Sequence, residues 1–154
     1  MSEAVQDLYA PSSICFGCGP ANTDGLRIKS FRNNEGLQMV FQPQKHHQAF
    51  PGVINGGIIG ALLDCHGNWT AAIAIMDRLG LEQPLCTVTA QYEVKLRRPT
   101  PFGPTLEVRS RILVLENDRA EVIIELQANG ETCATGRGLF VAVKEGHPAW
   151  HRWG

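Results

Sequence analysis

The segment from Pro51 to Met76, PGVINGGIIGALLDCHGNWTAAIAIM, most constrains what this chain can fold into. A Gly pair opens it, and the apolar residues that follow would cover every side of a helix. Such a helix must be buried all round, which a sheet wrapped about it would achieve. A membrane span is the competing interpretation, but Asp64, His66 and Asn68 stand mid-segment, where ionisable groups are costly in lipid. We therefore expect a buried core helix and no membrane partner.

Asp64 is the one acid in this segment. Residues three or four apart share a helix face, so Asp64 lies on a stripe of small and polar residues. The members of the stripe are Gly57, Gly60, Asp64, Gly67, Asn68 and Ala71. Close packing against another helix is one interpretation. We favour the other, a lone carboxylate with a raised pKa placed for chemistry, because an unpaired buried acid is costly. A substrate that approaches the stripe would contact Asn68.

The composition indicates a single reduced, intracellular domain. A length of 154 residues is enough for one hydrophobic core, and the net charge of −1 argues against a nucleic-acid partner. No charged segment followed by an apolar one opens the chain, so we expect a cytoplasmic protein. The odd number of cysteines at irregular spacing favours free thiols over a disulfide framework: Cys15, Cys18, Cys65, Cys86 and Cys133.

The Cys15-x-x-Cys18 pair lies in a run of turn residues, CFGCGPANTDGL. This spacing suggests zinc or redox chemistry. Zinc needs four ligands, however, and no second Cys pair or His pair follows at zinc-finger spacing. We therefore expect two packed thiols and no metal ligands.

Alternating and apolar runs predict strands on both sides of the helix. A hairpin over Leu26–Phe31 and Leu37–Gln42 should precede it. Four strands should follow, over Cys86–Pro99, Thr105–Asn117, Ala120–Asn129 and Thr132–Lys144, with Asn117-Asp118 and Asn129-Gly130 as turns. Two strands, one helix and four strands make an α+β pattern.

The ends of the chain lie outside this pattern. Residues 1–14 show no period, so we expect a loose N-terminal arm before a single domain over 15–145. The tail over 146–154 carries Trp150 and Trp153, which suit a cover over exposed surface or a partner contact.

The start of the helix is a candidate catalytic position. Gly56 and Gly57 place backbone N–H groups without intrahelical partners at the positive end of the dipole, where they could polarise a carbonyl. Asp64 lies eight residues further on, about 12 Å away along a helix. The Gly56 N–H and the Asp64 carboxylate of one chain therefore cannot reach the same substrate carbonyl. If both groups are catalytic, they must come from two subunits, which predicts a dimer with antiparallel neighbouring helices.

The combined motifs resemble a known family. A Gly-Gly helix start with an acid eight positions on, FPG before it and CxxCGPxNxxGL upstream are similar to the PaaI-like group of hotdog-fold thioesterases. The resemblance implies a sheet of five or six strands wrapped around one long central helix. It also implies a homodimer or homotetramer that hydrolyses an acyl-coenzyme A at the subunit interface with no other cofactor.

The resemblance also implies roles for individual residues. Gly56 would supply the oxyanion-hole N–H, and Asp64 of the other subunit would be the general base or nucleophile. Thr89 stands where relatives often place a Ser or Thr that helps hold the water. Asn55 stands where His is usual, and it can donate a hydrogen bond but cannot shuttle a proton.

Further residues are candidates for binding substrate. Lys95, Arg97 and Arg98 end a strand and could meet the phosphates of CoA, although a solvated strand end explains them equally well. Phe50 would line the acyl pocket, together with the helix stripe.

Two other functions remain open at this point. A hotdog dehydratase or isomerase would use a His near the helix start as its base, and His47 is the candidate. An inert acyl-CoA-binding module is suggested by Asn55 in place of His.

Overall fold

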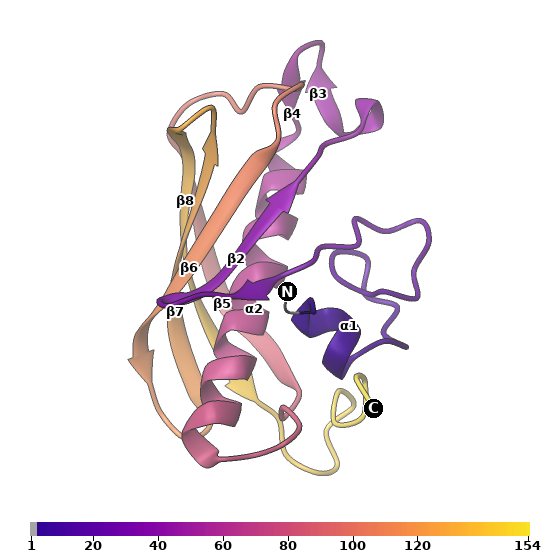
Figure 1. Cartoon of the computed structure of the whole chain (residues 1–154), viewed down its shortest axis with the longest axis vertical. Coiled ribbons are helices and arrows are strands. Elements are labelled where there is room, and N and C mark those ends of the chain that lie inside the picture. Colours follow the sequence, from indigo (N-terminus) through magenta and orange to yellow (C-terminus); the bar gives the residue numbers. More distant parts are fainter. Residues whose placement is uncertain (1–2) are drawn as a thin grey trace.

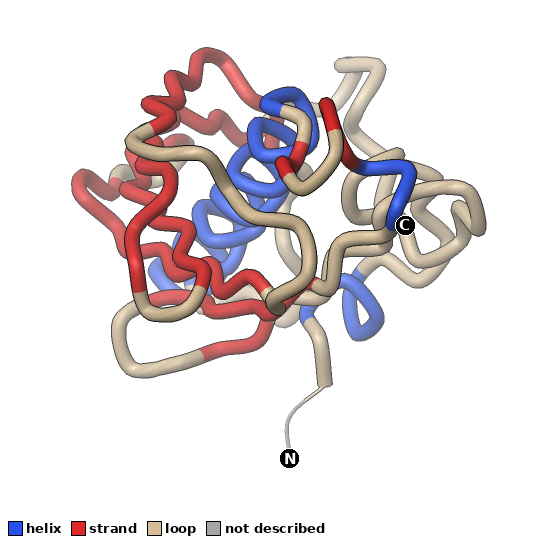
Figure 2. The backbone as a smooth tube through the Cα atoms, turned by 90° about the horizontal axis from the view of Figure 1, so that it is seen from above, coloured by secondary structure: helices blue, strands red, loops and turns tan. Residues whose placement is uncertain are grey.

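One long helix packed against one antiparallel sheet makes up the protein. The computed structural model describes residues 3–154. The helix, α2, runs over Gly56–Leu79 and is the segment predicted from the apolar run. Figure 1 shows α2 running the length of the molecule, and Figure 2 shows the strands curving around it. This is the hotdog-like α+β architecture that the resemblance implied.

The sheet has six strands in the order β1-β2-β6-β7-β8-β5, all paired antiparallel. Their bounds are β1 Phe31–Arg32, β2 Gly36–Phe41, β5 Thr87–Leu96, β6 Leu106–Leu115, β7 Arg119–Ala128 and β8 Glu131–Ala142. A small second pair, β3 Gln48–Phe50 and β4 Val53–Ile54, precedes α2 after a 3₁₀ turn at Lys45–His47. The four strands predicted after the helix are all present.

Local signals set both ends of α2. Asn55 caps the start, since its side-chain oxygen accepts from the Gly57 and Ile58 N–H groups at 2.7 and 3.2 Å. At the other end Gly80 has a φ of +67°, a left-handed conformation that suits glycine. The Leu81 N–H then bonds to the Met76 carbonyl at 3.0 Å, which closes a Schellman motif.

The Asn-Gly signal between β7 and β8 is also confirmed. Asn129 and Gly130 have φ values of +53° and +76°, the pair of positive values that a type I′ hairpin turn requires.

The predicted strand over Leu26–Phe31 is wrong for most of its length. Only Phe31 enters the sheet, yet Leu26, Ile28 and Ser30 are buried in alternation, as a strand would be. The backbone of this segment bonds to a loop instead: the N–H of Leu26 donates to Phe16 and that of Ile28 to Gly17. The alternation of buried side chains in this segment therefore indicates burial against the core, and it does not indicate that the backbone pairs in the sheet.

The expectation of a loose N-terminal arm is also wrong over the part that the structure describes. A short helix, α1 Val5–Tyr9, packs beside α2, with Val5 and Gln6 buried. The Gln6 side chain accepts from the Ser30 N–H and donates to the Ser30 hydroxyl, at 2.8 and 3.0 Å. Met1 and Ser2, also in the predicted arm, lie outside the described residues.

The period-two prediction holds for only part of β5. Its register shifts between Thr89 and Gln91, and beyond that point Tyr92 and Leu96 are exposed. A bulge moves the following side chains relative to the core, and this edge strand has a neighbour on one side only.

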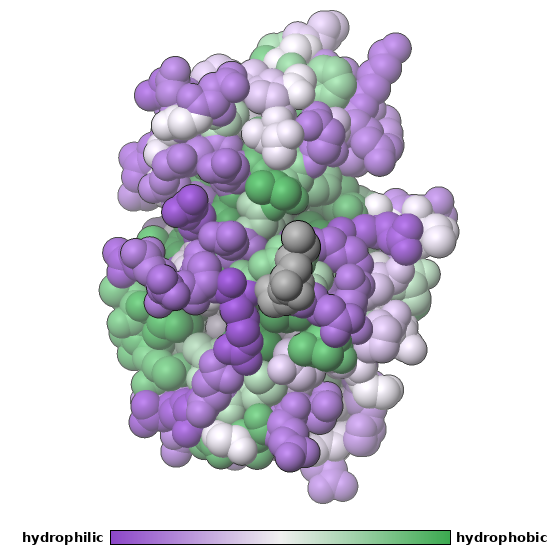
Figure 3. Space-filling view, in the orientation of Figure 1, coloured by the Kyte–Doolittle hydropathy of each residue, from purple (hydrophilic) through white to green (hydrophobic). Residues whose placement is uncertain are grey.

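The apolar helix is a core helix. α2 is long and apolar enough to cross a membrane, but most of that length is buried within the domain. Its small-residue stripe packs against the sheet and not against a helix, because a Cβ atom at Gly67 would lie 2.9 Å from Ile124 and Phe140. A substrate therefore has no access to this part of the stripe. Figure 3 shows a mainly hydrophilic outer face, with hydrophobic residues gathered at its lower left.

Candidate functional site

Asp64 lies in a cavity of about 280 Å³ beside α2, which we call the aspartate cavity. Its carboxylate accepts a hydrogen bond from the Thr89 hydroxyl of β5 at 2.6 Å. Within residues 3–154, no other hydrogen bond to this carboxylate is present. The lining residues come from the Cys15 loop, α2, β5 and the C-terminal tail: Cys15, Cys18, Asp64, Cys65, Asn68, Val88, Thr89, Ala149 and Arg152. Asp64, Asn68 and Thr89, three of the predicted site residues, thus share one cavity.

Two opposing effects set the pKa of Asp64. Burial raises the pKa of this carboxyl, while the hydrogen bond from Thr89 and the charge of Arg152 lower it. Thr89 also fixes the direction in which the carboxylate points. A half-buried carboxylate held in this way can accept a proton from a bound water molecule.

The start of α2 carries the predicted carbonyl-polarising group. The Asn55 side chain caps the Gly57 N–H, so that N–H is already engaged. The Gly56 N–H is the first of the helix and has no intrahelical partner. Gly56 is exposed, and Leu96 is the residue closest to where its Cβ would be. Of the two glycines, Gly56 is therefore the one that can donate to a ligand.

A second cavity, which we call the helix-start cavity, adjoins this end of α2. Its volume is about 380 Å³, and its lining comes from β3, β4, α2 and the end of β5: Phe50, Val53, Ile54, Ile59, Leu96, Arg97, Arg98, Pro99 and Thr100. Three predicted substrate residues are in this set. Arg97 also donates to Thr135 at 3.1 Å, and Arg98 pairs with Glu131 on β8. Lys95 lies earlier on β5 and is exposed.

The two cavities share no lining residue, so one chain does not bring all the predicted residues together. Gly56 and Asp64 are eight residues apart in one continuous helix, which separates them by about 12 Å along its axis.

His47 lies in a third place. Its Nδ1 accepts from the Gln44 N–H at 2.9 Å, and its ring lies tilted against the rings of Phe41 and His46, with centroids 5.7 and 4.3 Å away. Burial of the imidazole lowers the pKa of His47, and the charge of the neighbouring His46 lowers it further. It lines a cavity with Asp24 and Arg27, which does not include Asp64 or the residues of the helix-start cavity.

Sequence reasoning missed the third thiol beside the Cys15-x-x-Cys18 pair. The sulfurs of Cys15, Cys18 and Cys65 all lie within 4.8 Å of one another. Hydrogen bonds from Cys18 and Cys65 lower the pKa of Cys15, and the bond with Cys15 raises the pKa of Cys18 to about 11. Zinc-finger spacing indicates only ligands that follow one another closely in sequence, whereas Cys65 comes from α2, 50 residues after Cys15. His66, the residue after Cys65, bonds instead to the Ser30 side chain and the Leu37 carbonyl.

The C-terminal tail was also missed as a wall of the aspartate cavity. Trp153 stacks on Trp69 of α2 with ring centroids 4.1 Å apart, which is the covering role expected for the tail. The Arg152 guanidinium donates to the Thr87 carbonyl at 2.6 Å. The stacking anchors the tail so that Arg152 and Ala149 face Asp64 across the cavity.

Known proteins are similar to this chain at the level of solved structures. No protein-family model matches the chain, and no curated protein sequence matches it either. Solved structures do match. A thioesterase superfamily protein from Shewanella loihica is 32% identical, over 76% of this chain and 91% of that one, with a TM-score of 0.65. The fold is thus that of the hotdog thioesterases, and this chain belongs to the thioesterase superfamily.

More distant structures share the fold. The Escherichia coli PaaI protein from the phenylacetic acid degradation operon is 18% identical, over 77% of this chain and 81% of that one, with a TM-score of 0.65. A Bacillus halodurans protein solved with CoA is 20% identical, over 81% of this chain and 80% of that one, with the same TM-score of 0.65.

Proposed function

We propose that this protein hydrolyses the thioester of an acyl-CoA with a small or medium acyl or aryl group. The observation that carries the proposal is the Asp64 carboxylate, held by Thr89 at 2.6 Å in a cavity beside the central helix. Membership of the thioesterase superfamily supports the reaction type, and the related structure with CoA supports the substrate class.

The proposed chemistry uses the two groups already described. Asp64 takes a proton from water as the water attacks the thioester carbonyl, or attacks the carbonyl itself. The Gly56 N–H donates to the oxyanion that forms. In the general-base route the protonated Asp64 returns its proton to the sulfur as the C–S bond breaks, so CoA leaves as a thiol and the free acid remains. In the nucleophilic route CoA leaves as a thiolate that takes a proton from water, and a second water then hydrolyses the anhydride between Asp64 and the acyl group. One preorganised N–H contributes roughly 3–4 kcal/mol, and general-base help roughly 10²–10⁴-fold in rate.

The active site is a composite of two subunits in this proposal. Gly56 and Asp64 lie about 12 Å apart along one helix, so Gly56 of one subunit must meet Asp64 of another. Neighbouring antiparallel central helices bring these groups together twice in a homodimer. Pairs of dimers would form the tetramer.

The helix-start cavity suits the CoA part of the substrate. Arg97 and Arg98 offer guanidinium groups for phosphates, and Phe50 at the same cavity offers an apolar surface for the acyl group. Lys95 lies on the same strand and adds positive charge nearby. We place the protein in the cytoplasm, where acyl-CoA substrates occur and the five cysteines stay reduced.

The test is CoA release from a panel of short, long and aromatic acyl-CoAs. Asp64→Asn should lower kcat by about 10²–10⁴-fold, because the amide cannot accept the proton from water. Asp77→Asn is the matched control on the same helix. Asp77 is exposed, pairs with Arg32 at 2.7 Å, and should leave kcat unchanged.

Other outcomes would point to the alternative functions. CoA that binds without release from any substrate would indicate an acyl-CoA-binding module. Loss of water from, or isomerisation of, an acyl-CoA without CoA release, abolished in His47→Ala and kept in Asp64→Asn, would indicate the dehydratase or isomerase.

A further inference from the structure

Three cysteine sulfurs converge at one wall of the aspartate cavity. The Cys15 and Cys65 sulfurs are 3.9 Å apart, and all three lie within 4.8 Å of one another. A tetrahedral zinc ion with Zn–S bonds of about 2.3 Å holds its sulfurs about 3.8 Å apart. The sulfurs therefore need to close by about 1 Å at most to surround one ion.

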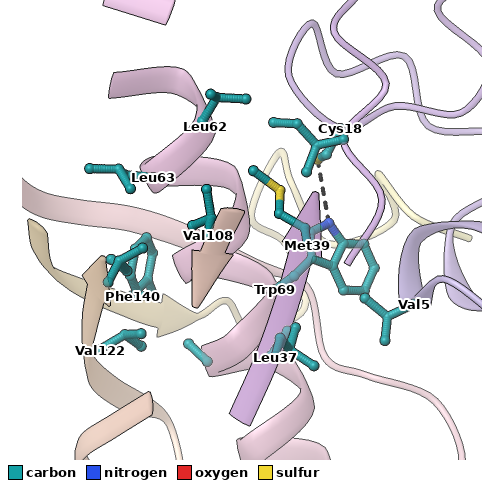
Figure 4. Packing of buried hydrophobic residues seen from close by; sticks show 14 of the residues in the cluster. Val5, Cys18, Leu37, Met39, Leu62, Leu63, Trp69, Val108, Val122 and Phe140 are labelled. Atoms are coloured by element: carbon teal, nitrogen blue, oxygen red, sulfur yellow. Dashed lines mark hydrogen bonds between the residues drawn. The ribbon is translucent and has the colours of Figure 1, made fainter. Parts of the chain in front are cut away.

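The surroundings of the sulfurs suit thiolate ligands. A Cβ atom at Gly17 would lie 2.3 Å from the Cys65 sulfur, so only glycine lets the loop close over it. The Trp69 indole N–H donates to the Cys18 sulfur at 3.4 Å, drawn as the dashed line in Figure 4. Such donors around metal-bound sulfur orient the ligands and stabilise their charge.

A buried polar atom beside the sulfurs lacks a partner. The Asn68 side chain is 6% exposed, and its Oδ1 has no hydrogen-bond partner among the residues that the structure describes. Asn68 follows Cys65 by three residues, so both occupy one face of α2 and line the same cavity. Water bound to a metal ion could donate to this oxygen.

A zinc ion on three thiolates carries a net charge of −1. The two charged side chains that also line the cavity, Asp64 and Arg152, offset each other.

We propose that Cys15, Cys18 and Cys65 bind a zinc ion whose fourth coordination position opens into the aspartate cavity. Thiolate ligands select soft or borderline metals, and three protein ligands plus water are typical of open zinc sites. The ion joins the Cys15 loop to the central helix across 50 residues of sequence. The argument for this site does not use the proposed hydrolase activity, because it depends only on the three sulfurs and the residues around them.

The test is a Co²⁺ titration of reduced, chelator-treated wild-type protein, with the zinc content of untreated protein measured in parallel. We expect one ion per chain, a thiolate-to-cobalt charge-transfer band, tetrahedral ligand-field bands, and displacement of cobalt by Zn²⁺. Cys15→Ser should lose the charge-transfer band. Cys15 is only half-buried, so this variant should fold, which circular dichroism can check.

The matched control is Cys133→Ala, a buried cysteine on β8 outside the cluster. It should bind cobalt as wild type does. Absence of a charge-transfer band in the wild type, or the same spectrum in Cys15→Ser, would overturn the proposal. So would a Cys15–Cys65 disulfide in protein purified without added oxidant. The wild-type titration needs no variant, so it tests whether the chain binds the metal ion even if Cys15→Ser does not fold.

Discussion

Gly56 is a residue at which one hydrogen-bond donor can be removed with little other change. Proline has no N–H and is favoured at the first position of a helix. The preceding Asn55 has φ −60° and ψ 134°, an extended conformation compatible with a following proline. We expect Gly56→Pro to lower kcat for CoA release by about 10²–10³-fold, the effect of losing one oxyanion-hole donor.

Gly56→Ala is the control for this prediction. It keeps the N–H, and its Cβ would meet Leu96 at 3.4 Å, an ordinary contact. Its kcat should stay within a few-fold of wild type. Equal activity in the two variants would show that the Gly56 N–H does not take part.

His66 is a fully buried residue that should make stability depend on pH. Its Nε2 faces the Leu37 carbonyl at 3.1 Å and must donate, so its Nδ1 accepts from the Ser30 hydroxyl at 2.7 Å. Burial lowers its pKa from 6.5 to about 4. Between these values the unfolded chain binds more protons than the folded one, so stability falls as pH decreases.

Urea unfolding at pH 7.5 and pH 5 measures this effect. We expect a loss of about 2 kcal/mol of unfolding free energy at the lower pH from His66 alone. The protein should be treated with chelator, so that a metal contributes nothing to the difference. His66→Gln should show a smaller loss, because Gln does not titrate. A wild type that is equally stable at both values would contradict the prediction.

At the scale of elements, the contact between α2 and the sheet depends on glycine at one position. Gly67→Ala would place a Cβ 2.9 Å from Ile124 and Phe140, so it should destabilise the protein by about 1–3 kcal/mol through overpacking. Gly60→Ala is the matched control, since its nearest neighbour is the Tyr92 hydroxyl at 3.6 Å. It should stabilise by up to about 1 kcal/mol through helix propensity. Thermal unfolding compares the two, and a change of the same sign in both would contradict the packing argument.

At the scale of the whole molecule, the composite site predicts complementation between two inactive variants. A heterodimer of Asp64→Asn with Gly56→Pro has one site with both wild-type groups and one with neither. Subunits mixed and refolded in equal amounts should therefore recover about one quarter of wild-type activity, since half the dimers are mixed and half their sites are intact. Each variant refolded alone is the control. A mixture as inactive as its components would place both groups in one subunit, or exclude one of them.

The sequence determined the elements that depend on neighbouring residues. The apolar run with Asn55 before it and Gly80 after it set the length of α2, because capping acts within a turn of the helix. Asn129-Gly130 set the β7–β8 hairpin for the same local reason. Burial all round then required a sheet around the helix, which fixed the architecture. Asp64 and Asn68 share a helix face that the sequence pattern predicts, and the structure shows that Thr89 of the following strand lines the same cavity.

Only the tertiary structure decided which distant segments meet. Cys65 joins Cys15 and Cys18, and Trp153 anchors Arg152 beside Asp64, because the N-terminal loop and the tail both pack on the same helix. A periodic pattern within one segment of sequence does not indicate which distant segments that segment contacts. The side chains from Leu26 to Ser30 alternate between buried and more exposed as in a strand, because every second one packs on the core. The backbone of this segment bonds to the Cys15 loop, because that loop, and not a strand, lies beside it in the fold.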